Sequence, residues 1–245
     1  MMATPENGRL DGLVAVVAGG AGAIGSAIAH RLAEAGARVY TLDSRSATAS
    51  ASADGTALEC DLTQPAQIAS ALTRIDTETG RLDIVVHAAG VVRDGRLWKV
   101  SDDDWRTVMS ANLDSAFYLL RAATPMLRRA GGAVVFISSI NGERGKVGQA
   151  AYAASKAGMN ALAKTAAREL GGFGIRVNVV APGWINTPMT TNLADGLRER
   201  ARQESVLGRL GEPDDVARVV WFLAGPMAAH VTGQVVRVDG GQLIG

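Results

Sequence analysis

A tyrosine and a lysine one helical turn apart are the side chains of this sequence best suited to proton transfer. Tyr152 and Lys156 lie in the segment YAASK, and their spacing of four places them on one face of a predicted helix. A phenol with a pKa near 10 is a poor acid or base at neutral pH, but a neighbouring ammonium favours the phenolate. The pair therefore predicts a tyrosine that exchanges a proton with a substrate, with a pKa lowered by Lys156.

A serine lies just before this pair along the chain. Ser139 follows a buried apolar run, at the carboxyl edge where ligands of open α/β sheets bind. Its hydroxyl can donate a hydrogen bond to a carbonyl or alkoxide oxygen and stabilise the charge that develops during hydride transfer. Taken alone, such a serine fits a loop or helix-cap role better than a catalytic one.

A glycine-rich turn near the N-terminus is typical of a dinucleotide site. The segment AGGAGAIG at residues 18–25 follows a β-branched run and precedes an amphipathic stretch. Glycine allows a sharp turn and a close approach to a pyrophosphate, whose charge the free N–H groups of a helix N-terminus stabilise. The segment predicts a nicotinamide dinucleotide beside Tyr152, and the positive ring would further favour the phenolate.

The end of the second predicted strand indicates which dinucleotide binds. Asp43 lies 18 residues beyond Gly25, where a carboxylate accepts hydrogen bonds from ribose hydroxyls and repels a 2′-phosphate. NAD is therefore predicted over NADP. Arg45 is the alternative, since it could bind a 2′-phosphate, although a solvated surface position suits it better.

Short apolar runs that alternate with amphipathic stretches must position these residues. The predicted strands are residues 14–18, 38–42, 56–60, 83–88, 132–138, 175–180 and 234–238. The predicted helices are residues 23–35, 65–79, 101–129, 149–170 and 213–224. Such alternation predicts an α/β fold, a doubly wound, Rossmann-type and mostly parallel seven-stranded sheet with helices on both faces. We expect a single domain over residues 1–245 with a loop at 44–55.

Composition excludes several classes of protein. Lys+Arg is 25 against Asp+Glu 24, so no charge excess favours nucleic acid or an acidic membrane. The single cysteine, Cys60, forms no internal disulfide, and three scattered histidines do not suggest a metal site. Residues 13–29 carry no charge, but their glycines do not suit a membrane helix or a signal peptide. We expect a cytoplasmic protein with a small-molecule substrate.

The order of the motifs resembles the short-chain dehydrogenase/reductase family over nearly the whole chain. The positions that correspond to the family's motifs are the glycine pattern at 18–25, the segment His-Ala-Ala-Gly at 87–90 in place of Asn-Asn-Ala-Gly, the catalytic asparagine at Asn112, the serine at Ser139, the Tyr-x-x-x-Lys pair, the Pro-Gly segment at 182–187, Thr-Gly-Gln at 232–234 and Asp-Gly-Gly at 239–241. The resemblance implies that Tyr152 donates or accepts the proton and that Ser139 holds the reacting oxygen. Lys156 would bind the nicotinamide ribose, and Asn112 would hold a water that links Lys156 to solvent.

The resemblance also implies a set of binding residues. The expected cofactor contacts are Gly19, Gly22, Ala23, Ile24, Asp43, Asp61, Leu62, Ala89, Gly90, Tyr152, Lys156, Pro182, Ile185 and Thr187. Within this set, Asp61 would contact the adenine, and Ile185 and Thr187 would hold the carboxamide. The expected substrate contacts are Ser139, Asn141, Gln149, Tyr152 and Trp184, with residues 189–207 as a candidate lid.

Four residues depart from the family pattern. Ala18 replaces a threonine whose hydroxyl ties the turn to the next segment, and Ala23 replaces a glycine. His87 and Ala88 replace two asparagines, so the usual tether of the fourth strand is missing or different. We interpret His87 as a buried, hydrogen-bonded histidine and not as a catalyst.

The sequence is compatible with three functions. The leading hypothesis is an NAD(H)-dependent oxidoreductase that interconverts a secondary alcohol and a ketone, with Tyr152 as general acid/base. The alternative is an NADPH-dependent 3-oxoacyl-(acyl-carrier-protein) reductase, and the third is a cofactor-binding scaffold without activity. The family resemblance further implies a homotetramer formed through the helices at 101–129 and 149–170.

Overall fold

The computed structural model describes residues 8–44, 55–188 and 195–245, and their strands form one sheet. Its strands are β1 (Val14–Ala18), β2 (Arg38–Asp43), β3 (Thr56–Glu59), β4 (Ile84–His87), β5 (Gly132–Ile137), β6 (Ile175–Pro182) and β7 (Val235–Val238). Their order is β3-β2-β1-β4-β5-β6-β7, and each neighbouring pair is parallel. The predicted doubly wound, seven-stranded sheet is confirmed. The direction in which successive strands are added to the sheet reverses between β1 and β4, and ligands of such sheets bind at this point.

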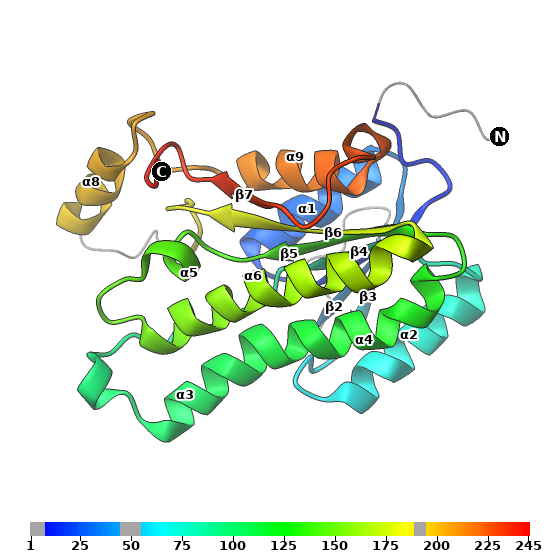
Figure 1. Ribbon diagram of the computed structural model, residues 1–245, viewed down its shortest axis with the longest axis horizontal. Coiled ribbons are helices and arrows are strands. Elements are labelled where there is room, and N and C mark those ends of the chain that lie inside the picture. The colour runs from blue at the N-terminus through cyan, green and yellow to red at the C-terminus, as the bar shows by residue number, and fades with distance from the viewer. Residues whose placement is uncertain (1–7, 45–54, 189–194) are drawn as a thin grey trace.

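Both faces of the sheet are covered by helices, so its central strands are apolar throughout. Helices α2 (Pro65–Thr79), α4 (Ser115–Leu127) and α6 (Ala150–Leu170) lie on one face, and α1 (Ala23–Glu34) and α9 (Pro213–Ala224) lie on the other (Figure 1). All five residues of β1 are buried. Val14 and Val16 belong to the first core and Ala15 and Val17 to the second, as the two-residue period of a strand requires.

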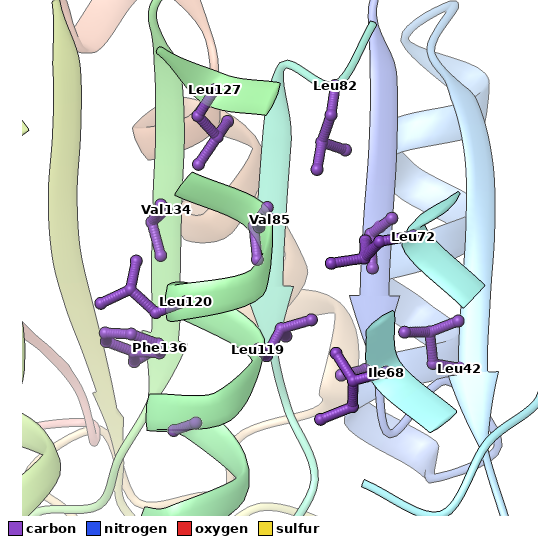
Figure 2. Close-up of a cluster of buried hydrophobic side chains, with 14 of the residues drawn as sticks. Leu42, Ile68, Leu72, Leu82, Val85, Leu119, Leu120, Leu127, Val134 and Phe136 are labelled. Atoms are coloured by element: carbon purple, nitrogen blue, oxygen red, sulfur yellow. The ribbon is translucent and has the colours of Figure 1, made fainter. Parts of the chain in front are cut away.

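Figure 2 shows how the larger core is filled. Ile68 and Leu72 of α2 and Leu119 of α4 reach the sheet, where they meet strand side chains such as Val85 and Val134. Branched aliphatic side chains from both layers interdigitate at this face, so the helices hold the carboxyl ends of the strands in a fixed arrangement.

The helix predicted at residues 101–129 is divided into three parts. It consists of α3 (Asp102–Met109), a π-helical segment η3 (Ser110–Asp114) and α4. A π-helical turn inserts an extra residue into a helix and often marks a functional site. Here the turn contains Asn112, so the break in the helix lies at a residue that the sequence singled out.

Several short elements were not among the predictions. They are η2 (Leu97–Lys99), α5 (Asn141–Arg144), η4 (Gly171–Phe173), α8 (Asp195–Glu204) and η5 (Pro226–Ala228). Arg45 and most of the loop predicted at 44–55 lie outside the described residues, as do residues 189–194 of the candidate lid. In the described ranges, no helix combines the length and apolar character needed to cross a membrane.

Candidate active site

A cavity of about 410 Å³ lies at the carboxyl ends of the strands. Its lining begins with the glycine turn after β1 and continues with the segments that follow β4, β5 and β6. The sequence-predicted residues that line it are Gly22, Ala23, Ile24, Ala89, Gly90, Ser139, Asn141, Gln149, Tyr152, Lys156, Pro182, Trp184, Ile185 and Thr187. Gly19, Asp43, Asp61, Leu62 and Asn112 were predicted for the site but do not line this cavity.

Ser139, Tyr152 and Lys156 come together inside the cavity. Ser139 lies two residues beyond β5, and α6 carries the other two side chains. The Ser139 and Tyr152 side chains are hydrogen-bonded to each other. The Lys156 Nζ lies 5.6 Å from the centre of the Tyr152 ring and donates to the Ile137 carbonyl at 2.8 Å.

The pKa of Tyr152 differs in direction from the sequence-based expectation. Burial raises this pKa, the hydrogen bond from Ser139 opposes the rise, and Asp94 adds to it. Lys156 is not among the groups that shift it, and its ammonium donates to the Ile137 carbonyl. Burial also lowers the pKa of Lys156 to about 8. The groups of the chain itself therefore favour a protonated phenol, and the predicted lowering by Lys156 is not observed.

Asn112 lies beneath the cavity and joins two segments that line it. Its Oδ1 accepts the N–H of Val91 at 2.8 Å, while its Nδ2 donates to the Val91 carbonyl at 3.1 Å and to Ser155 Oγ at 3.0 Å. Ser155 in turn donates to the Tyr152 carbonyl at 2.7 Å. A Cβ on Gly90 would lie 3.2 Å from Asn112 Oδ1 and 3.4 Å from Lys156 Nζ, so both groups approach that glycine. The side chain is fully buried, and the water expected between Asn112 and Lys156 stays a prediction.

The glycine turn has the shape that a dinucleotide requires. Gly19 has a φ of 84°, and a Cβ there would lie 2.5 Å from the Ala89 nitrogen. Gly22 caps α1 without a side-chain hydrogen bond, and Ala23 and Ile24 in the first turn of that helix line the cavity. A side chain would fill this cradle, whereas glycine leaves backbone N–H groups accessible to a pyrophosphate. The residues present therefore fit a nicotinamide dinucleotide, as the sequence predicts.

Asp43 and Asp61 both hold local structure at the same edge of the sheet. Asp43 Oδ2 accepts the N–H of Ala21 at 3.1 Å and so ties the end of β2 to the glycine turn. Asp61 Oδ1 accepts the N–H of Thr63 at 2.9 Å and its hydroxyl at 2.7 Å, before α2 begins. Leu62 beside it is buried. The predicted adenosine contacts of these three residues remain predictions.

Three of the predicted substrate residues, Asn141, Gln149 and Trp184, belong to one hydrogen-bonded wall of the cavity. Asn141 Nδ2 donates to Gln149 Oε1 at 3.0 Å, and Gln149 Nε2 donates to Asp94 Oδ1 at 3.1 Å. Arg144 Nε donates to Asn141 Oδ1 at 3.0 Å, and its Nη2 donates to Glu204 Oε2 at 3.2 Å. The wall thereby joins α5, the start of α6 and the last residue of α8.

Trp184 completes this wall after β6. Its indole Nε1 donates to Glu204 Oε2 at 3.2 Å, and its backbone N–H donates to Gln242 Oε1 at 3.1 Å. The Nζ of Lys146 lies 3.8 Å from the centre of its ring. The part of the candidate lid that the structure describes thus contacts the cavity wall through Glu204.

The departures from the family pattern are accommodated by other contacts. Backbone bonds hold the glycine turn beside Ala18, with the Gly19 N–H donating to the Leu42 carbonyl at 2.8 Å. His87 is fully buried, and its Nε2 lies 2.7 Å from Ser115 Oγ, as expected of a hydrogen-bonded histidine. Its Nδ1 has no partner in the described chain. Burial lowers the pKa of His87 to about 3, so the ring is neutral.

Sequence reasoning did not identify Asp94, Arg144, Lys146, Ser155 and Glu204. The polar segment NGERGKVGQ between β5 and α6 was a visible signal for Arg144 and Lys146, because it follows Ser139 directly. Glu204 lies within the candidate lid at 189–207, but its contact with Arg144, 60 residues away, had no signal in the sequence. In the described ranges, no group of three or more His, Cys, Asp or Glu residues is arranged to hold a metal ion.

Comparison with known proteins agrees with this geometry. A family model described as "Enoyl-(Acyl carrier protein) reductase" matches residues 6–242. The chain is similar to the 3-oxoacyl-[acyl-carrier-protein] reductase FabG of Thermotoga maritima, with 39% identity over 96% of this chain and 100% of the relative. The Escherichia coli FabG is 40% identical over 95% of this chain and 98% of that protein. The crystal structure of gox2181 superposes with a TM-score of 0.92 at 34% identity, over 96% of this chain and 97% of the other.

The parallel sheet, the glycine turn and the Ser-Tyr-Lys cluster define an oxidoreductase that uses a nicotinamide cofactor and acts on hydroxyl or carbonyl groups. The chain belongs to the short-chain dehydrogenase/reductase family.

Proposed function

We propose that this enzyme reduces the C3 carbonyl of a 3-oxoacyl thioester to a hydroxyl, with NADH as the hydride donor. The observation that carries the proposal is the hydrogen-bonded Ser139–Tyr152 pair in the cavity that the glycine turn also lines. The product is itself a secondary alcohol. The proposal therefore keeps the NAD(H) cofactor of the leading hypothesis from the sequence and takes its substrate class from the alternative, a 3-oxoacyl reductase.

The relatives support the substrate class. The two FabG proteins are named for 3-oxoacyl groups carried on a protein, and the similarity extends over nearly the full length of all three chains. The long cavity wall from Asn141 to Trp184 offers polar and aromatic surface beside the reacting pair, as an extended acyl thioester would need.

The roles of the site residues follow from their contacts. When bound, the nicotinamide ring supplies or accepts the hydride, and the backbone of the glycine turn with Lys156 would hold the cofactor. Tyr152 Oη donates its proton to the substrate oxygen as negative charge develops there. Ser139 Oγ donates a hydrogen bond to the same oxygen and stabilises this charge. Burial, which raises the pKa of Tyr152, keeps the phenol protonated as reduction requires.

The choice of NADH over NADPH rests on Asp43. Its carboxylate lies at the end of β2 and is fixed on the glycine turn by the Ala21 N–H. A carboxylate at this edge repels a 2′-phosphate and accepts hydrogen bonds from ribose hydroxyls. We expect kcat/KM to be at least tenfold higher with NADH than with NADPH. A preference for NADPH would refute NADH as the cofactor and support the NADPH-dependent reductase that the sequence offers as the alternative.

Replacement of Tyr152 by Phe tests the proposed chemistry. The variant keeps the ring that packs beside Lys156 and loses the hydroxyl that donates the proton. We expect kcat to fall by on the order of 10²- to 10⁴-fold, the usual contribution of general acid catalysis. The measurement is NADH oxidation with a 3-oxoacyl thioester, and NADH affinity by fluorescence serves as the control. Undiminished turnover with unchanged NADH binding would refute the role of Tyr152.

A further inference from the structure

One cation in the cavity wall, Lys146, has no hydrogen-bond acceptor among the residues that the structure describes. Of the charged nitrogen groups that line the cavity, Lys156 donates to the Ile137 carbonyl and Arg144 donates to Asn141 and Glu204. In the part of the chain that the structure describes, Lys146 Nζ forms no hydrogen bond or ion pair, and it lies over the Trp184 ring at 3.8 Å from its centre. A cation over an indole face is attracted to the ring, but its N–H donors still lack an oxygen partner.

The two carboxylates that act on Lys146 through their charge accept their hydrogen bonds from other side chains. Asp94 accepts a hydrogen bond from Gln149, and Glu204 accepts from both Arg144 and Trp184. The Lys146 side chain is half-buried, and burial lowers its pKa although both carboxylates oppose this shift. The ammonium has therefore lost part of its hydration without gaining a hydrogen-bonded partner from the described chain.

The other polar groups of this wall are already committed to one another. The Nδ2 of Asn141 donates to Gln149, Gln149 donates to Asp94, and the indole N–H of Trp184 donates to Glu204. These bonds hold Trp184 and the segment between β5 and α6 in place without using Lys146. The Lys146 ammonium thus lies over the held Trp184 ring with its N–H donors available, in the same cavity as Ser139 and Tyr152.

We propose that the Lys146 ammonium, held over Trp184, binds a second oxygen of the substrate, the C1 oxygen of a 3-oxoacyl group. Lys146 would then be a specificity-determining residue that selects compounds with two oxygens in a 1,3 relation over simple ketones. This inference rests on the proposed function and adds to it the residue that recognises the thioester carbonyl. A charged donor paired with a substrate oxygen gives strong discrimination, because an analogue without that oxygen leaves the buried donor unpaired.

Steady-state kinetics on paired substrates test the proposal. The pair is a 3-oxoacyl thioester of N-acetylcysteamine and a ketone of the same length that lacks the C1 oxygen. Wild type should favour the thioester at least tenfold in kcat/KM. In Lys146→Met, which keeps the length and apolar stem of the side chain, this preference should fall at least tenfold, mainly through a higher KM. Lys99→Met is the matched control, because Lys99 is exposed and does not line the cavity.

The outcomes separate this inference from the proposed function. A wild-type enzyme that favours neither the thioester nor the free 3-oxo acid over the simple ketone overturns both. A wild-type preference that Lys146→Met retains, or a loss that is equal for both substrates, overturns the role of Lys146 alone. The free 3-oxo acid is a third substrate. Its kcat/KM could exceed that of the thioester in wild type and fall to the same value in Lys146→Met. That result would show that Lys146 recognises a C1 oxygen, which supports the inference. It would also identify the acid as the natural substrate, which overturns the thioester assignment.

Discussion

Asp43 serves the fold and the proposed cofactor selectivity with a single carboxylate. Its distance from the glycine turn along the sequence identified it as a ribose-binding candidate. The structure adds that its Oδ2 accepts the Ala21 N–H at 3.1 Å, so the carboxylate also fixes the turn. A substitution that removes both the charge and the acceptor oxygen would therefore change the cofactor selectivity and the conformation of the glycine turn together, and the two effects could not be told apart.

Asp43→Asn separates these two roles. Asparagine keeps a side-chain oxygen for the Ala21 N–H but removes the negative charge that repels a 2′-phosphate. We expect the ratio of kcat/KM for NADH to that for NADPH to fall at least tenfold, with little change in melting temperature. Asp43→Ala, which also removes the acceptor, should lower the melting temperature further. An unchanged cofactor ratio in Asp43→Asn would assign the selectivity to another residue.

His87 makes the stability of the protein sensitive to acid. The ring is fully buried at the end of β4, contacts Ser115 and carries a pKa of about 3 against 6.5 for an exposed histidine. The folded state thus binds fewer protons than the unfolded state between these two values. The stability is fully present above about pH 6.5 and is lost as the pH falls toward 3.

His87→Asn should reduce this sensitivity, because asparagine does not titrate. One pKa unit corresponds to about 1.4 kcal/mol, so between pH 7 and 5 wild type should lose about 1–2 kcal/mol more than the variant. Urea unfolding at pH 7, 6 and 5 measures this difference, and the comparison of slopes is independent of any constant cost of the substitution. Parallel slopes for the two proteins would refute a buried, neutral His87.

At the scale of elements, the site depends on the close approach of α5 to α6. Helix α5 begins at Asn141, just beyond Ser139, and α6 carries Tyr152 and Lys156. A Cβ on Gly142 would lie 2.8 Å from the Lys156 carbonyl carbon, so only glycine allows this distance. Together with the π-helical turn that places Asn112, this contact holds the serine, tyrosine and lysine in one cavity.

Gly142→Ala should separate the two helices. Overpacking of this kind costs about 1–3 kcal/mol, and here it should also lower kcat, because Ser139 and Tyr152 are carried on the displaced segments. Gly171→Ala is the matched control, since nothing lies within 4 Å of the added Cβ and its φ of −56° suits alanine. We expect that control to change the stability by less than about 0.5 kcal/mol and to leave kcat unaltered. If both substitutions changed stability and kcat to the same extent, the close contact between Gly142 and the Lys156 backbone would be refuted.

At the scale of the whole molecule, the proposed homotetramer remains a prediction. Phe117 on α4 is 42% exposed, and α4 belongs to the helical stretch for which the family resemblance implies a subunit interface. An exposed aromatic side chain on the outer face of a helix that covers the sheet is typical of a surface that another subunit buries. The chain offers this surface without any change to the active-site cavity.

Light scattering coupled to size-exclusion chromatography tests this assembly. Wild type should have a mass of about 102 kDa, four times the 25.4 kDa of the chain. Phe117→Asp should shift the mass toward dimers or monomers, because a buried unpaired carboxylate strongly disfavours an interface. A wild-type mass near 25.4 kDa would exclude the tetramer, and a tetramer that persists in Phe117→Asp would place the interface elsewhere.

The parallel sheet, the helices that cover it and the positions of Ser139, Tyr152 and Lys156 were predictable from the amino-acid sequence, whereas the short helix α5 was not. These features depend on local periodicity and on short spacings, such as the four residues between Tyr152 and Lys156, which the chain carries within one element. Boundaries of β1, α2 and α9 agree with the structure for the same reason.

The environment of those residues follows from the packing of the folded chain. The raised pKa of Tyr152 comes from burial. The bond between Arg144 and Glu204 joins residues 60 positions apart, and Lys146 lies over Trp184, which belongs to a different connecting segment. Desolvation and long-range contacts depend on how whole elements pack, and no spacing within one segment records that packing.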